Sequence, residues 1–139
     1  MVRINIINPK YLTDQHLIAE YVEILMLLDY AKKNSPCNIP KKYCLGKGHI
    51  KFFSNKVLYL KKRHEEIKKE MKKRGFKASK NINLKKIDKK ILKDWGPTKK
   101  DKDIIKKRLI QRIKLKPNYY RYYKEKKPSW FLINLIKQA

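Results

Sequence analysis

The stretch Asp14-Gln-His-Leu-Ile-Ala-Glu-Tyr-Val-Glu-Ile24 decides the fold, because its apolar residues recur with the spacing of a helix that packs against a core. Thr13 or Asp14 is suited to cap this helix, which is expected to run to about Lys33, where Asn34-Ser-Pro36 stops it. Its apolar face comprises Leu17, Ile18, Tyr21, Ile24, Leu25, Leu27 and Leu28. The sequence therefore predicts one long helix that builds the core.

Two more helices are expected further along the chain. A helix capped by Ser54 or Asn55 is predicted to run to Arg74, and Gly75 follows at the position of a left-handed C-cap. A third helix is predicted over residues 101–114. Each of them carries an apolar stripe, so both are expected to pack on the first helix.

The other segments contain turn residues or scattered apolar residues. Residues 37–53 are expected to form a loop, and residues 77–97 a Lys-rich connection packed onto the helices. Residues 128–136 are expected to form a short capping helix, with a partner-binding or membrane-touching role as the alternative. No repeat or confident strand is evident. The predicted fold class is all-α: a compact single domain over residues 1–139 with three main helices and structured loops, in which residues 127–139 are a C-terminal extension packed on the core.

The charge of the chain points to a polyanionic partner. Its 139 residues include 38 Lys and Arg against 12 Asp and Glu, a formal net charge of +26. Such an excess repels itself unless a polyanion neutralises it, so nucleic acid is the expected partner. An AT-rich coding sequence would also enrich Lys, Ile and Asn, but it does not account for the excess of base over acid. No apolar run is long enough to span a membrane and the start lacks a secretion signal, so an intracellular protein without membrane contact is expected.

Familiar catalytic patterns are missing from the sequence. Cys37 and Cys44 lack the second pair that a zinc site or a disulfide framework would need. The run Gly46-Lys-Gly48-His49 resembles a phosphate loop only superficially, because no Gly-Lys-Ser/Thr follows it. The sequence therefore predicts no metal site and no cofactor.

One nucleophile leaves almost no trace in a sequence, namely the chain's own amine. An α-amino group titrates near pH 7.7–8.0, so roughly a fifth to a third of it is neutral at pH 7.4. Neighbouring cations increase that fraction, because they disfavour a further positive charge. Val2 is a small residue before which Met1 is commonly removed, and removal would expose the amine of Val2.

Three polar residues of the first helix share one surface. His16, Glu20 and Glu23 occur at i, i+4 and i+7, which places them within a stripe of about 60°. In one interpretation the two acids are solvated and His16 caps the first turn. In the other, a carboxylate serves a reactive group nearby, and the spacing alone leaves both open.

Three segments together resemble a known enzyme family. They are Arg3-Ile-Asn5 with the first helix, Leu45-Gly-Lys-Gly-His-Ile-Lys-Phe-Phe53 with the second helix, and Lys116-Pro-Asn-Tyr-Tyr-Arg-Tyr-Tyr123. In this order and spacing they resemble the pyrimidine-dimer DNA glycosylase/AP lyases of the phage endonuclease V type. The match spans most of residues 2–123.

The resemblance implies a metal-independent DNA-repair N-glycosylase with AP-lyase activity on UV-induced cyclobutane pyrimidine dimers. In that family the amine of residue 2, here Val2, attacks the anomeric sugar carbon and forms a Schiff base that β-elimination resolves. The essential carboxylate of the family falls on Glu23. Arg3 flanks the amine, and His16 matches a position beside the site. Glu20 also matches, with a salt bridge to a nearby base as its expected role.

The resemblance also identifies DNA contacts. Where the best-known members carry two Arg that hold DNA around the lesion, this chain has Val22 and Met26. The residues expected to bind DNA are Arg3, His16, Lys47, Lys51, Arg108, Arg112, Lys114, Lys116 and Arg121. The expected partner is lesion-containing double-stranded DNA, bound by a monomer in the cytoplasm of a prokaryote or a virus-infected cell, or in a nucleus. The alternatives are a basic architectural DNA-binding protein on the same fold and an RNA-associated protein.

Overall fold

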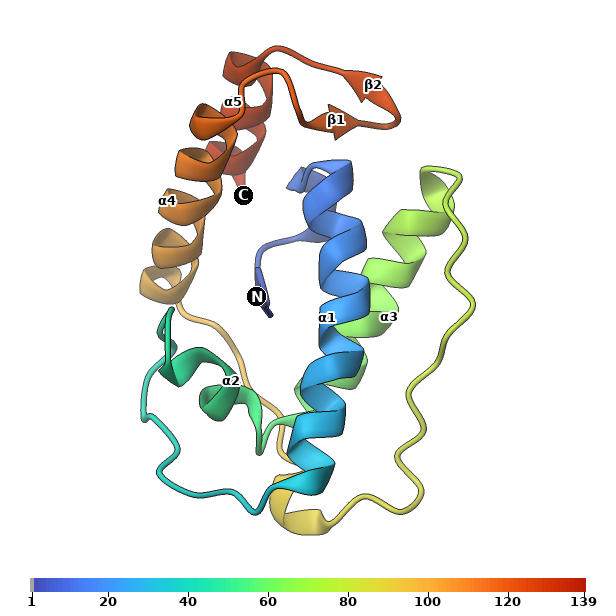
Figure 1. The fold of residues 1–139 in the computed structure, drawn as a ribbon, viewed down its shortest axis with the longest axis vertical. Coiled ribbons are helices and arrows are strands. Elements are labelled where there is room, and N and C mark those ends of the chain that lie inside the picture. Colours follow the sequence, from blue (N-terminus) through green and yellow to red (C-terminus); the bar gives the residue numbers. More distant parts are fainter. Residues whose placement is uncertain (1) are drawn as a thin grey trace.

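The computed structural model describes residues 2–139, which fold into helices arranged around the start of the chain (Figure 1). The elements in chain order are η1 (Pro9–Tyr11), α1 (Asp14–Lys33), α2 (Gly48–Phe53), α3 (Val57–Lys73), η2 (Lys89–Ile91), α4 (Lys99–Leu115), β1 (Arg121–Tyr122), β2 (Glu125–Lys126) and α5 (Ser129–Gln138). The expected all-α fold class is confirmed. Within residues 2–139 there is no helix long and apolar enough to cross a membrane.

The long helix α1 has the bounds that its sequence predicts. The hydroxyl of Thr13 accepts the N–H of His16 and caps the first turn, while the backbone of Asn34 is extended after the last. The side chains buried on its inner face are those of Asp14, Leu17, Glu20, Tyr21, Ile24, Leu27, Leu28 and Ala31. This face packs against α3 (Figure 1), so residues 14–24 do build the core.

Helix α3 starts differently from the prediction and ends as predicted. It begins at Val57 with Lys56 as the N-cap, and no side chain caps it. The predicted caps Ser54 and Asn55 are wrong, because the backbone of Ser54 still lies in the helical turn that closes α2. Gly75 has φ +87°, which is the left-handed conformation expected after the helix.

Helix α2 replaces the end of the loop that was predicted over residues 37–53. Its six residues are too few for a periodic pattern, and its apolar side chains cluster at its C-terminal end instead. Phe52 and Phe53 are buried there and contact the rings of Tyr43 and Trp95 edge-on, and Tyr43 and Trp95 stack on each other. Aromatic packing therefore fixes a segment that its turn residues made look irregular.

Helix α4 begins two residues before the predicted start. Thr98 and Asp101 form a capping box, in which each side chain accepts the backbone N–H of the other residue, at 3.2 and 2.9 Å. Asp101 is therefore the third helical residue and not the first. Helix α5 packs on α4 and buries Leu132 and Ile136.

The short hairpin of β1 and β2 is tied to the start of α1. Its turn residues Tyr123 and Lys124 both have positive φ, 52° and 68°, as a two-residue hairpin turn requires. The carboxylate of Asp14 accepts the N–H groups of both, at 3.1 and 2.7 Å. The side chain of Arg74 also donates to Asp14, so this corner fixes the hairpin relative to α1.

Candidate functional site

The start of the chain is an extended segment that is fixed through its backbone. The N–H of Ile4 donates to Nε2 of His49 at 2.9 Å, and the carbonyl of Ile4 accepts from the hydroxyl of Tyr43 at 3.0 Å. Nδ1 of His49 lies 2.9 Å from the carbonyl oxygen of Cys44, so Nδ1 carries the proton and Nε2 accepts. Burial lowers the pKa of His49 to about 4, which keeps this neutral form at physiological pH.

Glu20 holds the next residue and is itself neutralised by Arg63. Its Oε1 accepts the N–H of Asn5 at 3.1 Å. The guanidinium of Arg63 donates to both carboxylate oxygens, at 2.6 and 3.1 Å, and both side chains are buried. Arg63 also donates to the carbonyl of Ile7. The salt bridge expected for Glu20 is thus confirmed, and the interpretation of Glu20 as a solvated acid is wrong.

Glu23 faces the same segment one helical turn later. Its side chain is half-buried, and its carboxylate accepts the backbone N–H of Arg3. Burial raises the pKa of Glu23 to about 6, although the N–H of Arg3 opposes this shift. Val2 directly precedes Arg3, so its backbone nitrogen lies one residue, roughly 3–4 Å, before the nitrogen of Arg3. Met1, whose removal was considered above, lies outside the described residues.

Three arginines stand around this part of the chain. The side chain of Arg3 is buried, and α4 contributes Arg108 and Arg112 beside its buried positions. Burial lowers the pKa of Arg108, and the charges of Arg3 and Arg112 lower it further. Burial lowers the pKa of Arg3, and the charge of Arg112 lowers it further, whereas the charge of Glu23 raises it. Like charges held this close indicate a site for an anion.

His16 lies at the edge of this cluster, against the hairpin. The hydroxyl of Thr13 lies 2.8 Å from Nδ1 of His16 and also accepts the backbone N–H of His16. The ring stacks on Tyr120 at a centroid distance of 4.7 Å. Burial, followed by the charges of Arg108 and Arg112, lowers the pKa of His16 to about 4. His16 is therefore neutral at physiological pH.

The structure gathers only some of the predicted site residues. Val2, Arg3, His16, Glu23, Arg108 and Arg112 are brought together around the chain start. The other predicted DNA-binding residues are exposed: Lys47, Lys51, Lys114, Lys116 and Arg121. In the described part of the chain, no contact joins any of these five to Glu23. Lys116 lies over the ring of Tyr119, 4.9 Å from its centroid.

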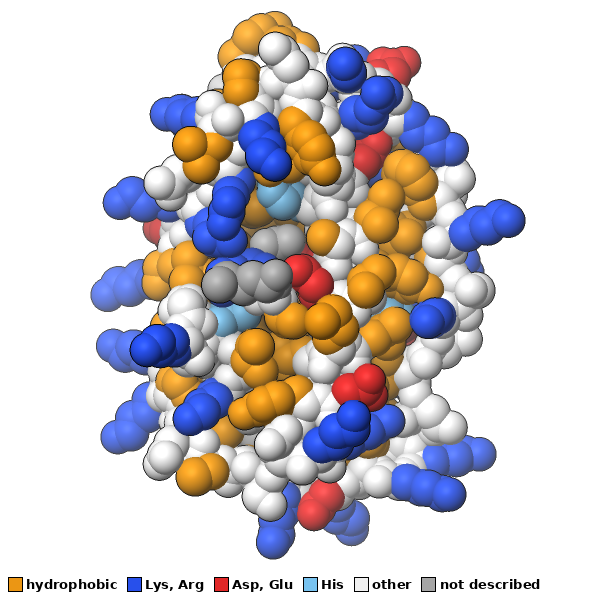
Figure 2. Space-filling view, in the orientation of Figure 1, with side chains coloured by type: hydrophobic (Ala, Val, Ile, Leu, Met, Phe, Trp, Pro, Cys, Tyr) orange, Lys and Arg blue, Asp and Glu red, His pale blue; other side chains and the backbone are white. Residues whose placement is uncertain are grey.

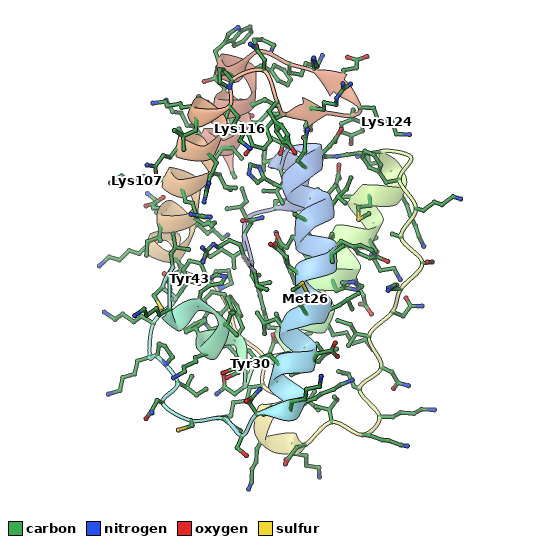
Figure 3. The ribbon with its side chains drawn as sticks, in the orientation of Figure 1. Met26, Tyr30, Tyr43, Lys107, Lys116 and Lys124 are labelled. Atoms are coloured by element: carbon green, nitrogen blue, oxygen red, sulfur yellow. The ribbon has the colours of Figure 1, made fainter. Side chains whose placement is uncertain are left out.

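The surface of α1 next to Glu23 carries no charge at two positions. Val22 and Met26 are 50% and 55% exposed, and Figure 3 shows Met26 pointing outward from α1. In Figure 2, hydrophobic side chains occupy much of the middle of this face with a few Lys and Arg among them, and most Lys and Arg stand around its rim. The helix therefore presents an apolar strip, Val22 and Met26, on both sides of Glu23.

Two residues that hold the chain start were missed by reasoning from the sequence. The sequence places His49 only in a run that superficially resembles a phosphate loop, and it gives no reason to single out Tyr43. Their one signal is composition, because a His and a Tyr sit beside apolar residues in a segment otherwise rich in Gly and Lys. Their partners are backbone groups some 40 positions away, which no local pattern records.

The arrangement can place a chain-start amine between a carboxylate and a cluster of cations. The carboxylate suits proton transfer and the stabilisation of positive charge, and the arginines suit phosphate. Across residues 2–139, no group of three or more His, Cys, Asp and Glu side chains is placed to hold a metal ion.

A comparison with protein families finds a match. The family model described as pyrimidine dimer DNA glycosylase matches residues 1–84. That span contains α1, α2 and α3, and with them Glu20, Glu23, His49 and Arg63. It ends before α4, so Arg108 and Arg112 lie outside the matched part. The resemblance expected from the sequence is confirmed.

Proposed function

The chain belongs to the pyrimidine dimer DNA glycosylase family, and we propose that it also cuts the DNA strand, with the α-amine of Val2 as its nucleophile and Glu23 as its carboxylate. Family membership makes it a DNA-repair glycosylase whose substrate is DNA. The proposal concerns how the reaction proceeds and which residues carry it.

In the proposed reaction, the neutral amine of Val2 attacks C1′ of the damaged nucleotide. The C1′–N bond forms as the glycosidic bond breaks, and the base leaves with the electron pair and takes up a proton. The amine loses a proton, the sugar ring opens and a Schiff base results. Loss of a C2′ proton then expels the 3′ phosphate by β-elimination, and water hydrolyses the imine and returns the amine. Glu23 stabilises the positive charge on the sugar and carries these protons.

One observation carries the proposal: the carboxylate of Glu23 accepts the N–H of Arg3, the residue directly after Val2. The only other acid at the chain start, among the residues described, is Glu20, which Arg63 neutralises. The raised pKa of Glu23, about 6, favours proton exchange near neutral pH.

The proposed DNA contacts follow from charge. Arg3, Arg108 and Arg112 hold the phosphates next to the reacting nucleotide, and neutral His16 contacts the DNA there. The more distant contacts are Lys47, Lys51, Lys114, Lys116 and Arg121. Extruding a damaged nucleotide bends the duplex, and these charges stabilise the distorted backbone.

Borohydride trapping tests the proposal on two preparations of the protein, one beginning at Val2 and one retaining Met1. Retention moves the amine by one residue, roughly 3–4 Å from its position near Glu23. We expect a covalent protein–DNA adduct from the first preparation, with a dimer or an abasic duplex, and at least tenfold less from the second. No adduct with either duplex would rule out the amine mechanism.

The exposed pair Val22 and Met26 favours a second candidate, an architectural DNA-binding protein on the same fold. It lacks the two charges with which related enzymes hold a lesion. This candidate predicts equal affinity for damaged and undamaged duplexes, and no effect of Glu23→Gln on strand cutting. Measurement of both properties separates it from the enzyme.

A further inference from the structure

A hollow of about 770 Å³ lies at the C-terminal end of α1, away from the chain start. It is walled by the last turn of α1, by the residues that follow it and by the segment that leads into η2. Its rim carries the lysines Lys32, Lys33, Lys85, Lys86 and Lys90. We call this the lysine hollow.

The five lysines of the hollow are exposed. The only acid in its lining is Asp88, whose carboxylate accepts the N–H of Lys90 as the cap of η2. None of the five lysines forms an ion pair with another of residues 2–139. Lys32 and Lys33 complement the negative end of α1, but the other three lysines approach from a different segment.

The hollow has an apolar floor. Ala31 and Ile91 are buried beneath the lysine rim, and Ile87 is half-buried beside them. A free inorganic anion has no apolar surface that could pack on these residues. A nucleic-acid backbone does, because each phosphate is joined to a sugar with an apolar face.

We propose that the lysine hollow binds the phosphodiester backbone of the same DNA molecule, on one flank of the reacting nucleotide. This inference rests on the proposed function, which brings DNA to Glu23. Glu23 and Lys33 are ten residues apart on α1, which is about 15 Å at 1.5 Å per residue. A duplex advances about 3.4 Å per base pair, so the hollow meets the backbone about four base pairs from the lesion.

The surface between the two contacts agrees with this arrangement. Met26 is uncharged and exposed and lies on α1 between Glu23 and the hollow, and the exposed Val22 next to Glu23 is uncharged as well. In Figure 2, Lys and Arg side chains gather beside the chain start and again at the lower end of the molecule, with hydrophobic side chains between them. The backbone would thus be held at two separated points.

Binding to duplexes with trimmed flanks tests the proposal. The probe is a duplex with a stable abasic analogue and ten base pairs on each side, and its affinity is compared with that of duplexes cut to two base pairs on one side or the other. The variant is Lys85→Gln/Lys86→Gln. The matched control is Lys69→Gln/Lys73→Gln, because these exposed lysines line a smaller hollow near Asn8 and Pro9, at the opposite end of the α1–α3 pair, which also contains Glu66 and Glu70.

We expect Lys85→Gln/Lys86→Gln to bind the full duplex 5- to 10-fold more weakly than the wild type, with a salt slope smaller by about 2. On the duplex trimmed on the sensitive side, the variant and the wild type should bind equally. The control should lose less than 3-fold on every duplex. An equal loss in both variants, or a loss that persists on both trimmed duplexes, would overturn the proposal.

The same variants separate this inference from the proposed function. At saturating protein, Lys85→Gln/Lys86→Gln should trap the borohydride adduct at the wild-type rate, because the hollow contacts only flanking DNA. If no adduct forms even with the wild type, the amine mechanism fails, while dependence of binding on the flank still decides the role of the lysine hollow.

Discussion

Glu20 and Glu23 are three residues apart on α1 and both accept an N–H from the chain start, yet their surroundings differ. Glu20 is fully buried and receives two hydrogen bonds from Arg63. Glu23 is half-buried, and no ion pair joins it to another residue in the described range 2–139. A fully buried carboxylate must be neutralised to be tolerated, whereas a half-buried one can remain reactive. The first therefore serves the fold, and the second is available for chemistry.

The largest expected effect is on stability, at Glu20. Glu20→Leu leaves the buried guanidinium of Arg63 without its counter-charge, so we expect the free energy of unfolding to fall by about 3–5 kcal/mol. Urea denaturation measures this change. The double variant Glu20→Leu/Arg63→Met should recover most of the loss, and Glu23→Gln should lower the free energy of unfolding by less than about 1 kcal/mol. A similar loss in Glu20→Leu and Glu23→Gln would remove the distinction between the two acids.

The second effect is on rate, at Glu23. Glu23→Gln keeps the size of the side chain and removes its charge, so we expect single-turnover strand cutting to slow by about 100- to 1000-fold, equivalent to about 2.7–4 kcal/mol. Cutting of an abasic duplex at saturating protein measures it. Circular dichroism should show an unchanged fold. A rate within 3-fold of the wild type would exclude Glu23 as the catalytic carboxylate.

The third effect is on pH dependence. Burial raises the pKa of Glu23 to about 6, so about a tenth of the carboxylate is ionised at pH 5. If strand cutting needs the ionised carboxylate, its rate at pH 5 should be about tenfold lower than protonation of the amine alone would make it. The logarithm of the rate should rise with a slope of 2 below pH 6 and a slope of 1 up to about pH 8. Carbon NMR of the Glu23 carboxyl should show a midpoint near 6, and a midpoint near the ordinary 4.5 would contradict this prediction.

The same raised pKa predicts the sign of a stability change. The folded-state pKa of Glu23 lies above the value of 4.5 for an ordinary Glu, so its protonation stabilises the folded state. This contribution is complete below pH 4.5 and is lost as the pH rises through about 6. The stability of Glu23→Gln relative to the wild type should therefore increase over that interval, as followed by urea denaturation at several pH values.

Local signals predicted the parts of the fold that local contacts determine. The cap at Thr13, the end of α1 at Lys33 and the left-handed Gly75 all follow from neighbouring residues. The predicted start of α4 was two residues late because a capping box places its acid inside the helix, at Asp101. Helix α2 was missed because its stabilising contacts are aromatic side chains distant in the sequence.

The candidate site shows the same division. The spacing of Glu20 and Glu23 placed them on one face of α1, but it could not tell which would meet a cation. That outcome depends on Arg63, 43 residues further along the chain from Glu20. The hydrogen bond from the N–H of Ile4 to His49 joins residues 45 positions apart, and no local pattern in the sequence predicts it either.

The smallest expected effect comes from restoring charge next to Glu23. In Val22→Arg/Met26→Arg, two exposed cations stand on either side of the carboxylate, one residue before it and three after it, so the pKa of Glu23 should fall toward 4.5. The same cations add phosphate contacts, and we expect the affinity for a dimer-containing duplex to rise about 3- to 10-fold, or about 0.7–1.4 kcal/mol. Fluorescence anisotropy measures the affinity and carbon NMR measures the pKa of Glu23, with Val22→Gln/Met26→Gln as the uncharged control.

A gain in affinity without a shift of the Glu23 pKa would show that the arginines contact DNA without approaching the carboxylate. A gain that the glutamine variant shares would mean that polarity and not charge limits binding on this face of α1.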